Sequence, residues 1–206
     1  MKRRLIVFAR APRLGQGKRR LAAGIGTLAA WRFQRWALAR VLRRLARDRR
    51  WECWLAVTGG AARWPRGVRR MTQCRGDLGR RMGRAMQTLG PGPVVLVGTD
   101  IPDIAPRHIQ AAFRALGRHD AVFGPAADGG FWLAGLRGRQ PGPFSNVRWS
   151  SRHALADTLA NLGPRRDYAL LEVLADIDDA AAYAGYFSCR RGINSTKLQG
   201  RKRLSS

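Results

Sequence analysis

Separate groups of residues in this chain have the types and spacing that a phosphate-handling site needs. The first is the loop RAPRLGQGKRRL, where Gly15 and Gly17 stand beside the cations Lys18 and Arg20. Glycines let backbone N–H groups approach a phosphate closely, and adjacent cations neutralise its charge. The loop fits neither a Walker A loop nor a dinucleotide fingerprint, and a solvated basic turn would use the same residues.

The second group is the run PVVLVGTDIPD, in which Asp100 follows the apolar residues 94–97. A short β-branched run bounded by Pro and Gly predicts a strand buried on both faces. Ligands of open α/β sheets bind at the carboxyl ends of the strands, so a carboxylate there suggests a metal or phosphate-proximal site. The alternative is that Asp100 merely caps a turn.

Further carboxylates lie near the end of the chain. In GPAADGGFWLAGL, Asp128 precedes two glycines that would let a substrate approach the main chain, although they suit a hairpin turn equally well. Asp176, Asp178 and Asp179 lie within four positions. Since the chain has only 13 acidic residues, this cluster indicates a functional group rather than incidental surface.

Alternating strand and helix patterns must position these residues. Strands are expected over residues 5–9, 53–57, 68–73, 94–97, 121–123 and 131–136. Helices are expected over 27–47, from a cap at Asp77 to about 89, over 106–116, and from a cap at Ser151 to about 162. The alternation predicts an α/β fold with a mostly parallel central sheet flanked by helices, and a ligand site at the strand ends.

Length, charge and cysteine content limit which kind of protein this chain can be. With 206 residues and 45% hydrophobic content, one domain over 1–187 and a basic flexible tail over 188–206 are expected. The net charge of +26 invites polyanion binding, but the arginines are spread along the chain. Three distant cysteines indicate no disulfide framework or zinc ribbon, and no apolar run is long enough to span a membrane, so a cytoplasmic protein is expected.

The motifs IVFARAPRLGQGKRRLA, QCRGDLGRRM, VLVGTDIPDI with HDAVFGPAADGGFWLAGL, and LADIDD occur in this order between Arg4 and about Ala182. Together they resemble a bacterial family of glycosyltransferase-A-type transferases, formerly a domain of unknown function, that is similar to the 2-phospholactate and molybdenum-cofactor guanylyltransferases. The resemblance implies a nucleotide-diphospho-sugar transferase fold with a divalent cation, Mg²⁺ or Mn²⁺, on the nucleotide phosphates.

The resemblance also implies roles for individual residues. It places Gly15, Gly17 and Lys18 at the nucleotide, and Asp128 at the second substrate as a catalytic residue. Arg20, a cation of the same loop, is also expected to bind the nucleotide. It makes Asp100 both a catalytic residue and a metal ligand, with Asp178 completing the metal site. Asp176 is the fallback ligand, because alternation along a strand would place it on the same face as Asp178. The chain departs from the family at Arg19, where Thr is usual, which removes a hydroxyl that could contact phosphate. It also departs at Arg80, where an acid is usual, so the substrate is less predictable.

The sequence therefore predicts a metal-dependent transferase that acts on a nucleoside triphosphate or a nucleotide sugar and on an unidentified small-molecule acceptor. Glycosyl and nucleotidyl transfer use the same loop and carboxylates, so both stay open. The alternative is a basic nucleic-acid-binding protein on an inactive transferase fold.

Overall fold

The strands form one seven-stranded sheet in a computed structural model that describes residues 1–60, 64, 67–138 and 142–188. The strands are β1 Arg4–Arg10, β2 Glu52–Thr58, β3 Arg69–Thr72, β4 Val94–Val97, β5 Ala121–Pro125, β6 Phe131–Leu136 and β7 Tyr168–Leu170. The helices are α1 Arg19–Ile25, α2 Thr27–Leu45, α3 Leu78–Thr88, α4 Pro106–Ala115 and α5 Ala154–Ala160. A helical segment also covers residues 180–188. None of the described helices is long and apolar enough to cross a membrane.

The sheet has the order β3-β2-β1-β4-β6-β5-β7. Strand β6 pairs antiparallel with β4 and β5, whereas the pairs β1–β2, β1–β4, β2–β3 and β5–β7 are parallel. Strand β4 lies fourth in this order, and all four of its residues are buried. This confirms the expected mostly parallel sheet with the run before Asp100 at its centre.

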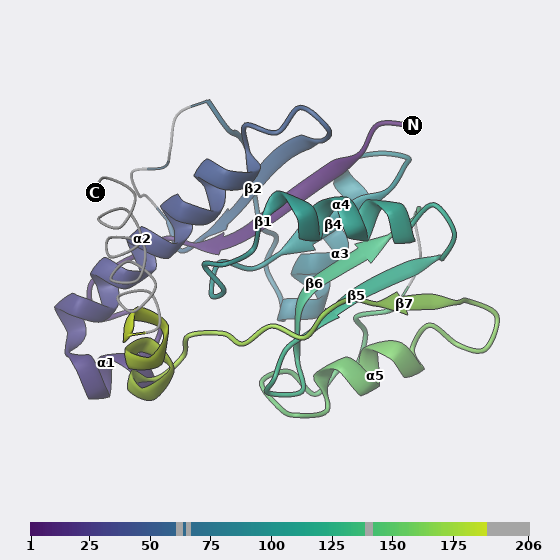
Figure 1. Cartoon of the computed structure of the whole chain (residues 1–206). Coiled ribbons are helices and arrows are strands. Elements are labelled where there is room, and N and C mark those ends of the chain that lie inside the picture. The colour runs from purple at the N-terminus through teal and green to yellow at the C-terminus, as the bar shows by residue number, and fades with distance from the viewer. Residues whose placement is uncertain (61–63, 65–66, 139–141, 189–206) are drawn as a thin grey trace, which may run out of the picture. The chain divides into compact units, whose positions relative to one another are not determined.

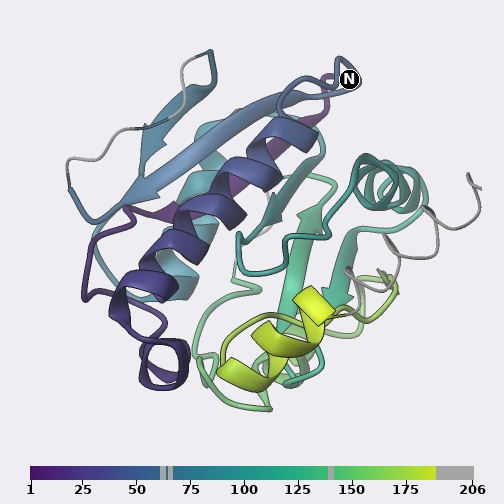
Figure 2. The same cartoon turned by 60° about the vertical axis from the view of Figure 1, so that its left-hand side comes forward.

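Apolar layers on both faces of the sheet hold the helices in place. One layer joins alternate β1 residues, Leu5 and Val7, to Val41 of α2 and Ile109 of α4. The other joins Ile6 of β1 to residues of α3, with side chains of α5 packed against it. Successive side chains of a strand point to opposite faces, so buried Leu5, Ile6 and Val7 need helices on both sides. Figure 1 shows α4 in front of the strands and α3 behind them, and Figure 2 shows α2 along β1 and β2.

The chain divides into two units, each with its own contacts. The first comprises Met1–Pro12 and Gln34–Asp176, and it contains the whole sheet. The second comprises Arg13–Phe33 and the chain from Ile177 onward. Within the second unit, the rings of Phe33 and Tyr183 meet edge to face at 5.5 Å between centroids, which ties α2 to the segment 180–188.

Several details differ from the sequence prediction. Helix α5 begins later than expected: His153, not Ser151, precedes its first residue, while the Ser151 hydroxyl donates to the Arg148 carbonyl at 2.6 Å. The short elements α1 and β7 were not expected. Most of the predicted tail, residues 189–206, lies outside the described residues, and Ser188 belongs to the last helical segment.

Candidate functional site

The carboxyl edge of the sheet gathers three of the predicted carboxylates. Asp100 follows β4, Asp128 lies between β5 and β6, and Asp176 follows β7 and the bridge between Ala126 and Leu174. Strands β4, β5 and β7 run in one direction, so the segments after them emerge at one edge. All three aspartates line a single cavity of about 290 Å³ within the first unit. The structure thus brings together residues that are up to 76 positions apart (176 minus 100).

The turn that carries Asp128 is held in one conformation. Asp128 Oδ1 accepts a hydrogen bond from Gly130 N at 2.9 Å. Gly129 has φ of +84°, and a Cβ atom there would lie 2.3 Å from the Arg152 carbonyl oxygen. Glycine is therefore required at position 129, both by the backbone conformation and by the close approach of Arg152. The turn connects the antiparallel strands β5 and β6, and Asp128 and Gly130 also line the cavity.

Aromatic side chains form another wall of this cavity. Trp132 is 5% exposed, and its Nε1 donates to the Glu172 carbonyl oxygen at 3.1 Å. A Cβ atom on Gly124 would lie 2.3 Å from the Trp132 ring, so this glycine makes room for the indole. The rings of Phe131 and Trp149 meet edge to face at 6.1 Å. These contacts fix the wall before any ligand arrives.

Sequence reasoning missed some of these residues. Trp149 and Ser150 line the cavity from the segment before α5, where the sequence shows no periodicity. His108, on α4, accepts a hydrogen bond from Ala105 N at Nδ1, and its Nε2 lies 3.0 Å from Glu172 Oε1. Burial and nearby Arg107 lower the pKa of His108, although Glu172 opposes this. The sequence signal for His108 was its place at the start of a predicted helix, two positions after Pro106.

The predicted nucleotide loop lies in the second unit. Gly15 and Gly17 have φ of +76° and +77°, and Lys18 precedes α1 with φ of +42°. The Lys18 ammonium, only 6% exposed, donates to Asp178 Oδ1 and to the Ile177 carbonyl, each at 2.7 Å. Arg20 also binds the Asp178 carboxylate, at 3.1 Å. In this structure the loop cations therefore hold Asp178.

Ion pairing controls the charge state of Asp178. Burial by itself raises the pKa of this carboxyl, but Lys18 and Arg20 outweigh it through charge and hydrogen bonds. The pKa of Asp178 consequently lies below its ordinary value, and the carboxylate is ionised at neutral pH.

The predicted metal ligands fall in both units, with Asp100 and Asp176 in the first and Asp178 in the second. Among the described residues, no group of three or more His, Cys, Asp or Glu is arranged to hold a metal ion. Carboxylate oxygens are nevertheless the donors that Mg²⁺ and Mn²⁺ prefer, and Mg²⁺ usually needs only one or two of them besides phosphates and water. The donor chemistry at the carboxyl edge therefore fits such an ion.

A larger cavity of about 710 Å³ lies along α3 and residues 142–146. Arg80 and Arg84 line it, but none of the predicted site residues does. The smaller cavity is the candidate site because it alone of these two combines acidic side chains with the carboxyl edge of the sheet.

Comparison with solved structures places this fold among known enzymes. A candidate nucleotide-diphospho-sugar transferase from Desulfovibrio desulfuricans G20 superposes with a TM-score of 0.80 at 30% sequence identity. The match covers 87% of this chain and 84% of that chain. This likeness confirms the nucleotide-diphospho-sugar transferase fold and supports a transferase.

More distant neighbours share the fold at lower identity. CMP:2-keto-3-deoxy-manno-octonic acid synthetase complexed with CTP has a TM-score of 0.53 at 14% identity, covering 97% of this chain and 100% of that chain. Rv0371c of Mycobacterium tuberculosis H37Rv, complexed with manganese, has a TM-score of 0.52 at 17% identity, covering 89% and 97%. No curated protein matches the chain significantly.

The family relationship rests on sequence as well as on fold. Residues 37–151 match the family model of DUF2064, which is described as an uncharacterized protein conserved in bacteria. This range runs from α2 to Ser151 and includes both Asp100 and the DGG turn. The chain belongs to the DUF2064 family and has the nucleotide-diphospho-sugar transferase fold that the sequence motifs predict.

Proposed function

We propose that this protein is a metal-dependent transferase that moves a glycosyl or nucleotidyl group from a nucleotide donor to a small-molecule acceptor. The observation that carries the proposal is the cavity lined by Asp100, Asp128 and Asp176. The chain has a net charge of +26 and only 13 acidic residues. Three of these acidic residues line one cavity at the carboxyl edge, which marks this cavity as a specific site. Ligands of α/β sheets bind at that edge.

Asp100 would hold a Mg²⁺ or Mn²⁺ ion, together with Asp176 of the same unit. Such an ion supplies charge neutralisation on the phosphates of the donor. The proposal is supported by the oxygen-donor chemistry of these side chains and by the manganese complex of a protein with the same fold. Because few carboxylates contribute, we expect weak metal binding until the nucleotide adds its phosphate oxygens.

The loop of Gly15 and Gly17 would bind the nucleotide, with Lys18 and Arg20 on its phosphates. Positive φ angles at both glycines give the loop a curved backbone that glycine adopts without strain. Lys18 and Arg20 bind an anionic partner, Asp178, in this structure. A phosphate is anionic, as the Asp178 carboxylate is, and it offers these cations more acceptor oxygens.

Asp128 would act on the acceptor. Its Oδ1 is engaged by Gly130 N, while Oδ2 makes no hydrogen bond to any described residue. We propose that this oxygen takes the proton of the acceptor hydroxyl as the acceptor oxygen bonds to the donor. In glycosyl transfer that bond forms at the anomeric carbon and a nucleoside diphosphate leaves; in nucleotidyl transfer it forms at the α-phosphorus and pyrophosphate leaves.

A thermal-shift screen tests the proposal. Nucleoside triphosphates and nucleotide sugars are added with and without MnCl₂, because a ligand that binds the native state raises its stability by about 2.7 kcal/mol at 100 times its dissociation constant. We expect an increase in melting temperature that needs both metal and nucleotide. The absence of any such increase across the screen would refute the proposal. Product analysis by mass spectrometry then separates glycosyl from nucleotidyl transfer.

A basic face supports the second candidate, nucleic-acid binding on an inactive transferase fold. Arg43 of α2 and Arg114 of α4 are exposed on helices that cover the same face of the sheet, as are Arg47 and Arg118 just beyond them. No described residue pairs with these four arginines. Binding through phosphate contacts would fall steeply with salt.

The discriminating measurement is fluorescence anisotropy of a labelled single-stranded oligonucleotide between about 50 and 300 mM salt. The double variant Arg43→Glu, Arg47→Glu should weaken binding, whereas Arg165→Glu, an exposed arginine away from these helices, is the matched control. Equal effects of both changes would show that the arginine face is not a specific surface.

A further inference from the structure

The larger cavity, of about 710 Å³, is a second place in the first unit where a ligand can bind. It extends along α3 and shares no lining residue with the candidate site. Leu78 and Met82 of α3 line the candidate site, whereas Arg80 and Arg84 of the same helix line the larger cavity. Helix α3 therefore contributes to both cavities, through different side chains.

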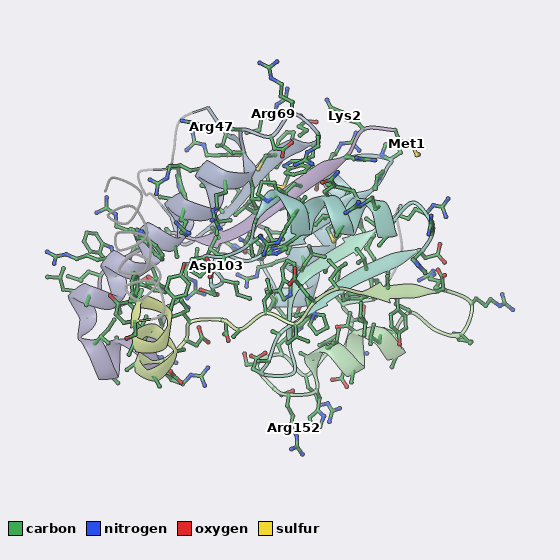
Figure 3. The ribbon with its side chains drawn as sticks, viewed as in Figure 1. Met1, Lys2, Arg47, Arg69, Asp103 and Arg152 are labelled. Atoms are coloured by element: carbon green, nitrogen blue, oxygen red, sulfur yellow. The ribbon has the colours of Figure 1, made fainter. Side chains whose placement is uncertain are left out.

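Arg80 and Arg84 are the only cations among the described residues that line either cavity. They are four positions apart on α3, so their Cβ atoms lie about 5–6 Å apart and both side chains can reach one ligand. Their hydrogen bonds to described residues use only main-chain atoms. Other arginines, such as Arg152, extend away from the strands (Figure 3). The pair at this cavity is therefore a specific arrangement, even in a chain with 39 Lys and Arg residues.

The other polar groups of the lining leave the cavity with a net positive charge. Asp77 is its acidic residue, and Asp77 Oδ1 accepts a hydrogen bond from Arg80 N at 2.7 Å. This carboxylate thus caps the first turn of α3. Gln87, Ser145 and Asn146 add amide and hydroxyl groups that can donate to an anion.

The wall formed by residues 142–146 is held in place without a ligand. Asn161, which follows α5, donates from Nδ2 to the carbonyl oxygens of Pro143 and Ser145, at 3.2 and 2.6 Å. Phe144 is buried against α3, where a Cβ atom on Gly79 would overlap the Phe144 carbonyl oxygen. These contacts give the cavity a defined shape beside the two arginines.

Buried apolar side chains complete the lining. Met86, Val94, Leu136 and Phe144 are each at most 5% exposed. The rings of Phe144 and Phe131 lie 6.4 Å apart between centroids, and Phe131 lines the candidate site, so this ring pair lies between the two cavities. An apolar lining with a few placed polar groups is typical of a site for a small organic ligand.

We propose that this cavity binds a small phosphorylated compound, with its phosphate on Arg80 and Arg84 and its organic part against the apolar lining. A single guanidinium fork occupies both oxygens of a carboxylate, whereas a phosphate has enough oxygens to accept from two guanidinium groups at once. The site goes beyond the proposed function, because none of Asp100, Asp128 and Asp176 lines it. Free phosphate offers the same charge without the organic part, so the test compares the two sources.

Saturation-transfer NMR of phenyl phosphate with the full chain tests the proposal. EDTA is present throughout, so metal-dependent nucleotide binding does not contribute. Phenol is the probe without a phosphate, and inorganic phosphate is added as a competitor. We expect phenyl phosphate to bind, phenol to give no signal, and inorganic phosphate to displace phenyl phosphate only at a higher concentration than unlabelled phenyl phosphate requires.

Removing the two charges should weaken this binding. The double variant Arg80→Gln, Arg84→Gln loses charge-assisted hydrogen bonds while glutamine remains a good helix former, and we expect affinity for phenyl phosphate to fall about tenfold or more. The matched control is Arg165→Gln, Arg166→Gln, which removes the same charge from the segment between α5 and β7 and should bind as the unchanged chain does. Equal weakening in both double variants would overturn the proposal, because it would show a general effect of charge.

Gly83→Leu blocks the cavity without changing its charge. Gly83 lines the cavity, and a Cβ atom there would meet only Phe144 Cδ2, at 3.9 Å, so a leucine side chain has room to enter. Leucine is a stronger helix former than glycine, so we expect α3 to persist and phenyl phosphate binding to be lost. Full binding in this variant, or no binding to the unchanged chain, would overturn the proposal.

The remaining outcomes separate the two claims. Displacement by inorganic phosphate at the same concentration as by phenyl phosphate would overturn the role of the apolar lining. Failure of the metal-dependent nucleotide shift would refute the proposed function, whereas the measurements in EDTA would still report on this second site.

Discussion

Lys18 and Asp178 bind each other in this structure, and each is also expected to take part in nucleotide binding. The Lys18 ammonium is almost fully buried and holds the Asp178 carboxylate at 2.7 Å. Both residues carry expected roles toward a nucleotide, one on its phosphates and the other on a metal. Their pairing keeps each charge neutralised while no ligand is bound, which avoids the cost of a buried unpaired charge.

Replacing Lys18 tests the phosphate role. Lys18→Ala should weaken metal-dependent nucleotide binding by about tenfold or more, since hydrogen bonds to charged groups contribute roughly 1.5–3 kcal/mol. Isothermal titration calorimetry measures the affinity, and circular dichroism confirms that the fold is retained. Lys2→Ala is the matched control, because Lys2 is an exposed lysine whose ion pair among the described residues is with Glu52. Unchanged affinity in Lys18→Ala would contradict the phosphate role.

Asp128 should affect the reaction more than nucleotide binding. The change Asp128→Asn keeps an oxygen that can accept from Gly130 N, so the turn should persist. It removes the group that takes the acceptor proton, and a fall in kcat of about 10² or more is expected. Steady-state kinetics and nucleotide titration are compared on the same variant. Equal losses in both would place Asp128 in the nucleotide site instead.

The ion pair at Asp178 predicts a dependence of stability on pH. Since the pKa of Asp178 lies below its ordinary value of 3.8, its contribution is present at neutral pH and is lost as the pH falls through the folded-state pKa. Melting temperatures of the natural chain and of Asp178→Asn should differ at pH 7 and converge at acidic pH. A constant difference across this range would show that the carboxylate charge is not the cause.

At the scale of elements, the structure shows which patterns predict well. Helix α4 was predicted because Pro106 begins it and Ile109 and Phe113 follow its period, and β4 because it is short, β-branched and buried on both faces. Helix α1 could not be predicted, since only Leu21 among its seven residues is buried and basic residues begin it. Its helical form depends on tertiary contacts, such as the approach of Gly24 to Ala180.

The candidate site was predictable only in part, for a physical reason. Strand ends in a parallel sheet share an edge, which allowed Asp100 to be placed there from sequence. The aromatic wall depends on tertiary contacts between β6 and the segment before α5, and no local sequence pattern predicts such contacts. Trp149 could therefore be assigned to the cavity only from the structure.

Gly129, in the turn between β5 and β6, is a position where any side chain should destabilise the hairpin. Gly129→Ala would place a Cβ atom against the Arg152 carbonyl and force a φ of +84° on an L-residue. We expect a loss of about 2–4 kcal/mol in the free energy of unfolding, measured by urea denaturation. Gly138→Ala serves as the control, since a Cβ atom there meets no described atom within 4 Å and no positive φ is required. Equal stability of the two variants would mean that the turn can relax.

At the scale of the whole molecule, the expected metal ligands belong to different units. Asp100 lies in the unit that contains the sheet, and Asp178 in the other. Asp100→Asn should abolish manganese-dependent nucleotide binding, because the proposed ion needs that carboxylate. Asp178→Asn should reduce it, because the change alters the residue that holds Lys18 and Arg20 of the nucleotide loop. Calorimetric titration with and without MnCl₂ measures both.

A double-mutant cycle shows whether the two carboxylates act together. Coupled ligands of one ion give non-additive losses, with interaction free energies of about 0.5–3 kcal/mol. Pairing Asp100→Asn with Asp48→Asn, which precedes β2 and so lies at the opposite, amino-terminal edge of the sheet, provides the additive reference. Strict additivity between positions 100 and 178 would separate Asp178 from the metal and leave Asp176 as its partner.

The two borders of the sheet have a consequence for how this protein behaves at high concentration. An unpaired border strand can recruit a strand from another chain and begin aggregation. Here β3, with only four residues, exposes Arg69 and Arg70, and β7 has only three residues. Repulsion between arginines protects β3 against pairing with another chain, and the short length of β7 protects the other border. Because salt screens the repulsion but does not change the length of β7, association during storage in concentrated salt should begin at β3.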